Sequence, residues 1–185
     1  TLDSELKMLR VIRRLKENYA VGIKATFLGA HAIPASYREN RQGYIDHIIR
    51  DMLPVIAEEG LADYMDVFCD KGFYTVEETD MLLKTAAGFG LKAKIHANEL
   101  ANSGGVQIGI KNNAISVDHL EEIGSDEIEA LHQSRTIATV LPSCSYFLGI
   151  PYAPARKMID AGLGIAIASD YNPGTSPSGN LSLLM

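Results

Sequence analysis

Ionisable side chains follow four separate apolar runs of the sequence, at the points where those runs end. They are His31 after TFLGA, His96 after KAKI, His119 after ISVD and Asp170 after IAIAS. Imidazole and carboxylate groups are ligands for Zn²⁺ and iron, and an ion with an open coordination position activates water near neutral pH. A carboxylate beside such a site can take the proton of the water and pass it to a leaving nitrogen. These residues therefore predict a metal-dependent hydrolase with Asp170 as its base.

Glu99 follows His96 closely, in the segment HANE. It lies just past the same apolar run, where its carboxylate could hydrogen-bond a substrate amide. The alternative is a solvated charge at the start of a helix, where acidic residues are favoured. His47 and His132 lie inside helical patterns and are expected at the surface.

Short apolar runs alternate with longer amphipathic segments along the chain. The runs predict six buried strands, at 23–29, 65–69, 92–96, 114–117, 136–141 and 164–168. Helical patterns lie at about 3–17, 44–59, 76–88, 101–111, 125–133 and 153–161. Thr75 with Glu78 forms a capping-box pattern at the start of one of them. Because the spacing leaves room for a helix between successive strands, it predicts parallel pairing in repeated βα units.

Polar residues at the ends of several different strands are typical of a barrel, which carries its active site on the loops after its strands. A complete (β/α)8 barrel typically needs ~250 residues, and the chain has 185. We therefore expect an α/β fold in which residues 1–185 form a single partial TIM-like (β/α)8 barrel domain of about six βα units.

The composition excludes several other classes of protein. The net charge is −6 and the basic residues are scattered, so nucleic acid is not an expected partner. No apolar stretch reaches the ~20 residues that cross a bilayer, so no membrane partner is expected and the cytoplasm is the expected location. Cys69 and Cys144 are not in a CxxC pair and are expected to be reduced core residues. The sequence contains neither a GxxxxGK[ST] phosphate loop nor a GxSxG nucleophile elbow.

Several motifs resemble those of a known family. They are TFLGAHAIPASY (26–37), KIHANELANSGG (94–105), SVDHLEEI (116–123), LPSCSYFLGIPYAPARKMIDAGL (141–163) and IAIASDYNPGTSP (165–177). From Gly22 onward the chain resembles the imidazolonepropionase family of the metal-dependent amidohydrolase superfamily. The resemblance implies hydrolysis of the ring amide C–N bond of 4-imidazolone-5-propanoate to N-formimidoyl-L-glutamate, a step of histidine degradation that uses one zinc or iron ion.

The resemblance also implies roles for individual residues. HANE places a metal ligand at His96 and a catalytic, substrate-contacting carboxylate at Glu99, and DHLE places a catalytic acid or base at His119. Asp170 in SDYNPG resembles the catalytic aspartate that also binds the metal. Positions that bind the substrate are matched by Glu99, His31, Asn172, Gly174 and Thr175.

The chain departs from the family in one respect that concerns activity. The family's first barrel strand ends in a His-x-His pair that supplies two metal ligands, and this sequence contains no such pair. The six predicted strands resemble the third to eighth of the family's barrel, so the resemblance implies that its first two βα units are absent. The family's β-sandwich domain is not found either. We therefore expect an internal part of a longer protein, with little or no activity when isolated and with its open sheet edges covered, as in a homo-oligomer. The alternatives are another cyclic amidase or deaminase of the superfamily, or a non-catalytic fragment.

Overall fold

Six parallel strands form one sheet, and they lie in the sheet in the order in which they occur along the chain. The computed structural model describes residues 1–183. The strands are β1 (Thr26–Ala30), β2 (Tyr64–Cys69), β3 (Lys92–Ala97), β4 (Ser116–His119), β5 (Ile137–Val140) and β6 (Ile165–Ile167). All six predicted strands are confirmed, with small shifts at their ends.

Helices connect the strands. They are α1 (Leu2–Asn18), α2 (Arg41–His47), α3 (Leu53–Glu58), α4 (Val76–Gly88), α5 (Gly105–Lys111), α6 (Ser125–His132), α7 (Pro142–Leu148) and α8 (Ala155–Asp160). Shorter turns are η1 (Ala35–Tyr37), η2 (Ile48–Met52) and η3 (Leu181–Leu183). The capping box predicted for α4 is present, because Thr75 and Glu78 exchange hydrogen bonds.

The helices differ from the prediction in two places. The single helix expected over 44–59 is interrupted by η2, a π-helical turn. Pro54 follows this turn; its ring would clash with the carbonyl of Arg50 in a regular α-helix, and the wider turn relieves that clash. Sequence reasoning also missed α7, although Pro142 at its first position is a recognised start signal.

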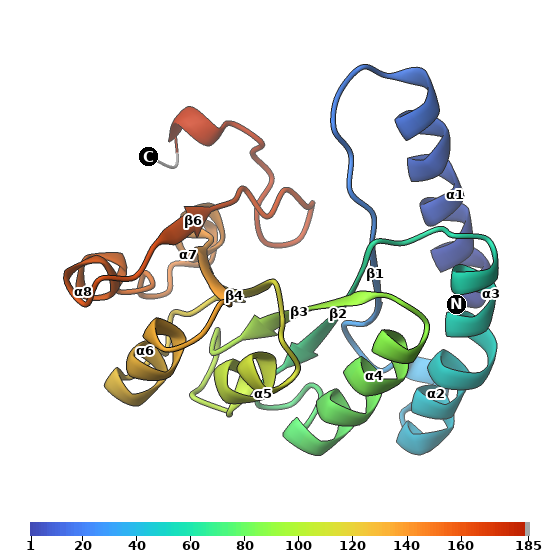
Figure 1. The fold of residues 1–185 in the computed structure, drawn as a ribbon, viewed down its shortest axis with the longest axis horizontal. Helices are drawn as coiled ribbons and strands as arrows, with labels where there is room; N and C mark the ends of the chain where they lie inside the picture. Colours follow the sequence, from blue (N-terminus) through green and yellow to red (C-terminus); the bar gives the residue numbers. More distant parts are fainter. Residues whose placement is uncertain (184–185) are drawn as a thin grey trace.

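The sheet curves into an arc that carries α4, α5 and α6 on its outer side, with β1 and β6 at its two edges (Figure 1). Alternate strand residues, among them Ile95 and Val117, face these helices and are fully buried. At Gly109 of α5 an added Cβ would lie 2.7 Å from Cγ1 of Val117, so this close approach of helix and sheet requires glycine. The expected partial α/β barrel is confirmed.

The concave face of the sheet is polar, unlike the face that meets the helices. Strand register places Asp66 beside Lys94, and His96 beside Asp118. Lys94 forms an ion pair with Asp118, and His96 with Asp66. A buried charge is costly unless it has a partner, and both pairs meet that requirement.

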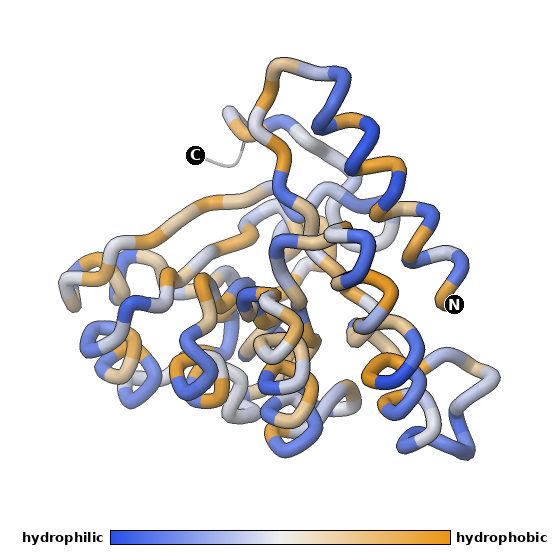
Figure 2. The backbone as a smooth tube through the Cα atoms, turned by 45° about the vertical axis from the view of Figure 1, so that its right-hand side comes forward, coloured by the Kyte–Doolittle hydropathy of each residue, from blue (hydrophilic) through white to orange (hydrophobic). Residues whose placement is uncertain are grey.

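Helix α1 is amphipathic, and the tube in Figure 2 alternates between hydrophobic and hydrophilic segments along it. Its buried side chains include Leu6 and Leu9. Asp63 joins this end of the chain to the sheet: its carboxylate accepts hydrogen bonds from Lys16 Nζ at 2.7 Å, from Lys24 Nζ at 3.0 Å and from the backbone N–H of Ala25 at 2.8 Å.

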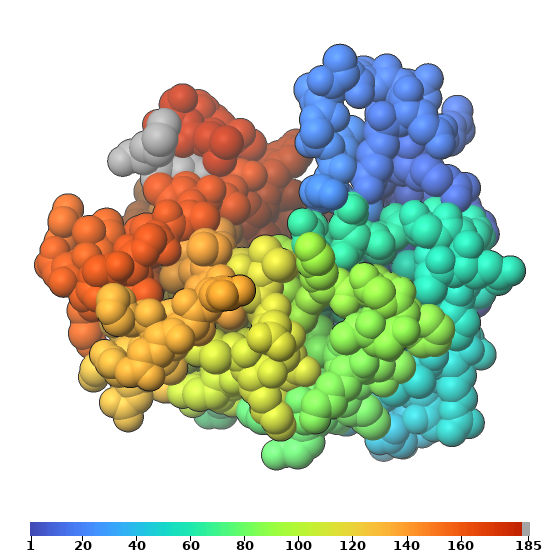
Figure 3. All heavy atoms as spheres, in the orientation of Figure 1, coloured from blue at the N-terminus to red at the C-terminus, as the bar shows by residue number. Residues whose placement is uncertain are grey.

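Helix α1 and the C-terminal residues form separate bulges with a hollow between them on the face seen in Figure 3. No helix among the described residues has the length and apolar character needed to span a membrane.

We expect Asp63→Asn to destabilise the protein by about 1–3 kcal/mol at pH 7, because the amide loses charge-assisted bonds to two lysines. Burial alone would raise the pKa of Asp63, but its hydrogen bonds from Lys16, Ala25 and Lys24 hold that pKa below the ordinary range. A lowered carboxyl pKa adds stability above the pKa of the unfolded chain, about 3.9, and this contribution is lost as the pH falls.

Urea unfolding at pH 7 and near pH 3 measures this effect. The difference between wild type and Asp63→Asn should shrink at the lower pH. Asp160→Asn is the control, because Asp160 is exposed and pairs only with Arg156 at 3.6 Å; it should change stability by less than about 0.5 kcal/mol at either pH.

Candidate active site

One cavity of about 480 Å³ lies at the carboxyl ends of the strands. The sequence-predicted site residues all line it, together with apolar side chains such as Phe68 and Phe73. The predicted residues are His31, His96, Glu99, His119, Asp170, Asn172, Gly174 and Thr175. Strands β1, β3, β4 and β6, or the loops that follow them, contribute these residues. The structure thus brings together residues that are far apart in the sequence.

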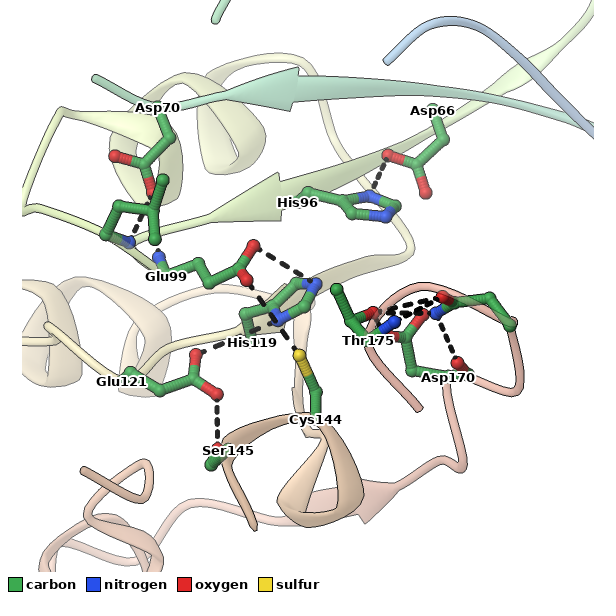
Figure 4. A network of polar contacts seen from close by, with 12 residues as sticks. Asp66, Asp70, His96, Glu99, His119, Glu121, Cys144, Ser145, Asp170 and Thr175 are labelled. Carbon is green, nitrogen blue, oxygen red and sulfur yellow. Dashed lines mark hydrogen bonds and ion pairs between the residues drawn. The ribbon is translucent and has the colours of Figure 1, made fainter. Parts of the chain in front are cut away.

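His96 is held by a buried carboxylate from the neighbouring strand. Its Nδ1 lies 2.9 Å from Oδ1 of Asp66, as Figure 4 shows. With Nδ1–H bonded to Asp66, Nε2 is the nitrogen left for a metal ion, which would displace the Nε2 proton; this is the arrangement found when a carboxylate orients a metal-binding histidine. Burial would lower the pKa of His96, but the charge and hydrogen bond of Asp66 outweigh it and raise the pKa to about 9.

Asp70 holds the loop that carries Glu99. One oxygen of this buried carboxylate accepts hydrogen bonds from the backbone N–H groups of Glu99 and Leu100, at 2.8 and 2.9 Å. Its other oxygen accepts one from the hydroxyl of Ser103 at 2.8 Å. Asn98, just before Glu99, has a φ of 54°, a left-handed conformation that is uncommon outside glycine. The loop therefore turns sharply after β3 and is fixed by one carboxylate.

His119 lies between two carboxylates at the end of β4. Its Nε2 is 3.6 Å from Oε2 of Glu99, and its Nδ1 is 3.8 Å from Oε2 of Glu121. Left-handed backbone at His119 and Leu120, with φ of 84° and 72°, ends the regular alternation of the strand here. Ser145 donates a hydrogen bond of 2.7 Å to the other oxygen of Glu121.

Burial dominates the titration of this group. It lowers the pKa of His119 to about 3, and the nearby charge of His96 acts in the same direction, so the ring is neutral at neutral pH. Burial also raises the pKa of Glu121 to about 7, against the opposing hydrogen bond from Ser145. The pKa of Glu99 is likewise raised by burial. The carboxylates beside His119 are therefore easier to protonate than ordinary glutamates.

The loop after β6 is closed by the side chain of Asn172. Its Oδ1 accepts hydrogen bonds from the N–H groups of Gly174 and Thr175, both at 2.8 Å, and its Nδ2 donates to Asp170 O at 2.7 Å. Thr175 Oγ1 lies 3.3 Å from Oδ2 of Asp170, so its hydroxyl can donate to that carboxylate. In this geometry Asn172 shapes the loop, and its contact with a substrate stays a prediction.

His31 is exposed at the edge of the cavity, on the segment that follows β1. Its ring centre lies 5.3 Å from that of Phe68 and 5.7 Å from that of His96. It is therefore placed to meet a molecule that enters the cavity.

Sequence reasoning missed four side chains that hold or adjoin the predicted ones: Asp66, Asp70, Glu121 and Cys144. Asp66 was visible as an acidic residue inside the apolar run MDVFC, and Asp70 follows that run directly, as the predicted residues follow theirs. The positions of Glu121 and Cys144 left no such signal.

Two groups of side chains offer ligands of the kinds that bind metal ions. The first is His96 with Asp170; both line the cavity, and the negative charge of Asp170 contributes to the raised pKa of His96. The second is Glu99, His119 and Cys144, whose ligand atoms all lie within 4.8 Å of one another.

Imidazolonepropionases from several bacteria are similar to the chain along its whole length. The Flavobacterium johnsoniae protein is 57% identical over 185 residues, and the Thermoanaerobacter pseudethanolicus protein is 46% identical over 183 residues. These alignments cover 100% and 99% of this chain but 45% and 44% of the two relatives, so the chain spans slightly less than half of their length. No protein-family model matches the chain. The similarity confirms the resemblance that the motifs indicated.

Solved structures with a similar fold include two deaminases. Guanine deaminase from C. acetobutylicum with bound guanine has a TM-score of 0.72 at 15% identity, covering 98% of this chain and 46% of its own. Adenosine deaminase from Xanthomonas campestris with bound zinc has a TM-score of 0.66 at 13% identity, covering 92% of this chain and 41% of its own. At such low identity this likeness concerns the fold alone, and it agrees with a partial α/β barrel.

We expect Asp70→Asn to destabilise the protein by about 1–3 kcal/mol, because both oxygens of Asp70 accept bonds from backbone N–H groups, one oxygen from Glu99 and Leu100 and the other from Lys71, whereas an amide has a single oxygen to accept them. The loop after β3 should also loosen. Hydrogen exchange at the amides of Glu99 and Leu100 measures this loosening, and unfolding in urea measures the loss of stability. Asp126→Asn, at an exposed position, is the control; equal protection of the two amides in both variants would contradict the role given to Asp70.

Proposed function

We propose that the protein acts as an imidazolonepropionase, which hydrolyses the ring amide C–N bond of 4-imidazolone-5-propanoate to N-formimidoyl-L-glutamate. The observation that carries this proposal is the convergence of the HANE, DHLE and SDYNPG segments on one cavity. The similarity of the whole chain to proteins of that name supports it. The chain spans less than half of the length of those relatives, and the activity is proposed for a protein of their full length.

His96 and Asp170 would hold one zinc or iron ion. The donor set of an imidazole and a carboxylate suits both metals, and Asp66 leaves Nε2 of His96 available for one. When bound, such an ion polarises a carbonyl and lowers the pKa of water. Further ligands would come from a His-x-His pair outside this sequence. The zinc in the adenosine deaminase of similar fold is in line with this assignment.

Asp170 would act as the base. It would take the proton of the attacking water as the water oxygen bonds to the ring carbonyl carbon, and would give the proton to the ring nitrogen as the C–N bond breaks. The Thr175 hydroxyl, 3.3 Å from Oδ2 of Asp170, would hold the carboxylate in one orientation for both transfers.

Glu99 and His119 would act on the amide from the other side of the cavity. His119 is neutral at neutral pH, because its pKa is lowered by burial, and it can donate or accept a hydrogen bond without adding charge. The Glu99 carboxyl can accept a bond from a ring N–H. The two side chains lie 3.6 Å apart, so a single amide group can meet both.

The remaining residues would select the substrate. His31, at the exposed edge of the cavity, is suited to the propanoate carboxylate. The loop of Asn172, Gly174 and Thr175 would hold the imidazolone or formimidoyl group. A small-molecule substrate of histidine degradation fits a cytoplasmic location, and a homo-oligomer would cover the open sheet edges.

A chimera tests this proposal. The 185 residues replace the matching segment of the Flavobacterium johnsoniae imidazolonepropionase, to which they are 57% identical. We expect the chimera to consume 4-imidazolone-5-propanoate. The loss of the ultraviolet absorbance of this substrate measures the reaction. A folded chimera that deaminates guanine or adenine instead, or has no activity while the parent enzyme is active, would contradict the proposal.

Asp170→Asn in the chimera should lower kcat by ~10²–10⁴-fold, because the amide cannot take a proton from water. His132→Asn is the matched control, since His132 is exposed on α6 and far from the cavity lining. Equal kcat for the two variants would remove Asp170 from the role of base.

A further inference from the structure

Three side chains with three different donor atoms meet at one side of the cavity. Glu99 comes from the loop after β3, His119 from the end of β4 and Cys144 from α7 (Figure 4). Sγ of Cys144 lies 3.9 Å from Oε1 of Glu99, and Nε2 of His119 lies 3.6 Å from Oε2 of Glu99. The ligand atoms of all three residues lie within 4.8 Å of one another.

These separations match the edges of a metal coordination shell better than hydrogen bonds. A good N–H···O bond measures about 2.7–3.2 Å, and the contact between Glu99 and His119 is longer. In a tetrahedral zinc site with bonds of about 2.0–2.3 Å, nitrogen and oxygen ligands lie about 3.4 Å apart, and sulfur and oxygen ligands about 3.6 Å apart. The two observed distances, 3.6 and 3.9 Å, are within a few tenths of an ångström of those values, but they start from the two different oxygens of Glu99. The carboxylate would bind the ion through both oxygens, or would turn to bring one oxygen toward both partners.

All three side chains are already ordered and buried. Cys144 is 0% exposed, His119 2% and Glu99 8%. A cation would enter from the cavity, which Glu99 and His119 line, and its fourth coordination position would face that cavity. Little rearrangement is needed, because small shifts of a few side-chain atoms bring the three ligands to bonding distance.

We infer that Glu99, His119 and Cys144 form a second metal site, selective for divalent ions that bind thiolate well, such as Zn²⁺, Co²⁺ and Cd²⁺. The thiol loses its proton to solvent as the metal–sulfur bond forms. The thiolate and the carboxylate together then balance the two positive charges of the ion. The thiolate selects against Mg²⁺ and Ca²⁺, which prefer oxygen ligands.

The negative charges around the cluster favour a cation, which would also offset the cost of the thiolate, because burial raises the pKa of the Cys144 thiol to about 12. Burial raises the pKa of Glu99; His96 opposes this shift, and the negative charges of Asp170 and Asp70 add to it. The imidazole of His119 is neutral, so its lone pair is free for an ion. A divalent cation would offset the cost of holding a buried carboxylate among other acidic groups.

The second site is distinct from His96 and Asp170. Metal binding at the second site does not depend on the proposed function. Its effect on activity does rest on that function, because an ion held by Glu99 and His119 withdraws both side chains from the substrate. Zinc in excess of the catalytic ion would then inhibit the enzyme.

Cobalt titration of the reduced 185-residue chain tests the site, because a Co²⁺–thiolate bond gives a charge-transfer band in the near ultraviolet. We expect this band in wild type and in Cys69→Ser, and its loss in Cys144→Ser. Cys69→Ser is the matched control, because Cys69 is also a buried free cysteine but is not part of the cluster. The absence of a band in wild type at saturating Co²⁺, or a band that persists in folded Cys144→Ser, overturns the inference.

Glu99→Gln keeps the cysteine and so decides the question even if Cys144→Ser does not fold. It should weaken Co²⁺ binding, read from the same band, by at least ~10-fold. Asp170→Asn, which removes a ligand of the proposed catalytic ion, should leave both band and affinity unchanged, and excess Mg²⁺ should not displace Co²⁺. Unchanged affinity in Glu99→Gln, or loss of the band in Asp170→Asn, counts against a separate site.

Discussion

The rest of the structure depends on one geometric constraint: all six strands are parallel, so all their carboxyl ends meet at one rim. Side chains from His31 to Thr175 therefore line one cavity although most of the chain separates them. The helices on the outer side of the sheet make the strands parallel, because each helix returns the chain to the opposite rim before the next strand begins. The candidate site is thus a direct consequence of the order of the elements.

Pairing of buried charge then decides how each of these side chains lies. Asp66 holds the ring of His96, Lys94 pairs with Asp118, and Asp70 binds the backbone of the Glu99 loop. An unpaired charge in these positions would be costly, so each carboxylate fixes the group it contacts. The same groups supply the electrostatics: Asp66 raises the pKa of His96, whereas burial beside His96 lowers that of His119. Two imidazoles whose ring centres lie 5.2 Å apart therefore differ in charge.

The residues around His119 show how one cluster can serve two chemistries. Without a second ion, Glu99 and His119 are suited to hydrogen-bond a substrate amide. With Cys144 they form a set of three ligands of the kind that holds zinc. The difference lies in the thiol of Cys144, which has no part in the proposed reaction and is brought close by α7.

The sequence by itself determined the order of strands and helices, because buried strands and amphipathic helices have different apolar periods. It also determined the identity of the polar residues at the strand ends, and through its motifs the resemblance to a family. Only the tertiary structure decided which other side chains hold these polar residues in place. Asp66 and Cys144 contact site residues from a neighbouring strand and from another helix, and a contact between distant parts of the chain has no local period to reveal it. Glu121 lies only two residues after His119, and the left-handed backbone between them decides that their side chains meet. The tertiary structure also fixed the interruption of the helix at η2 and the left-handed backbone at His119. Packing and sterics at these positions override the secondary-structure propensity of the segment.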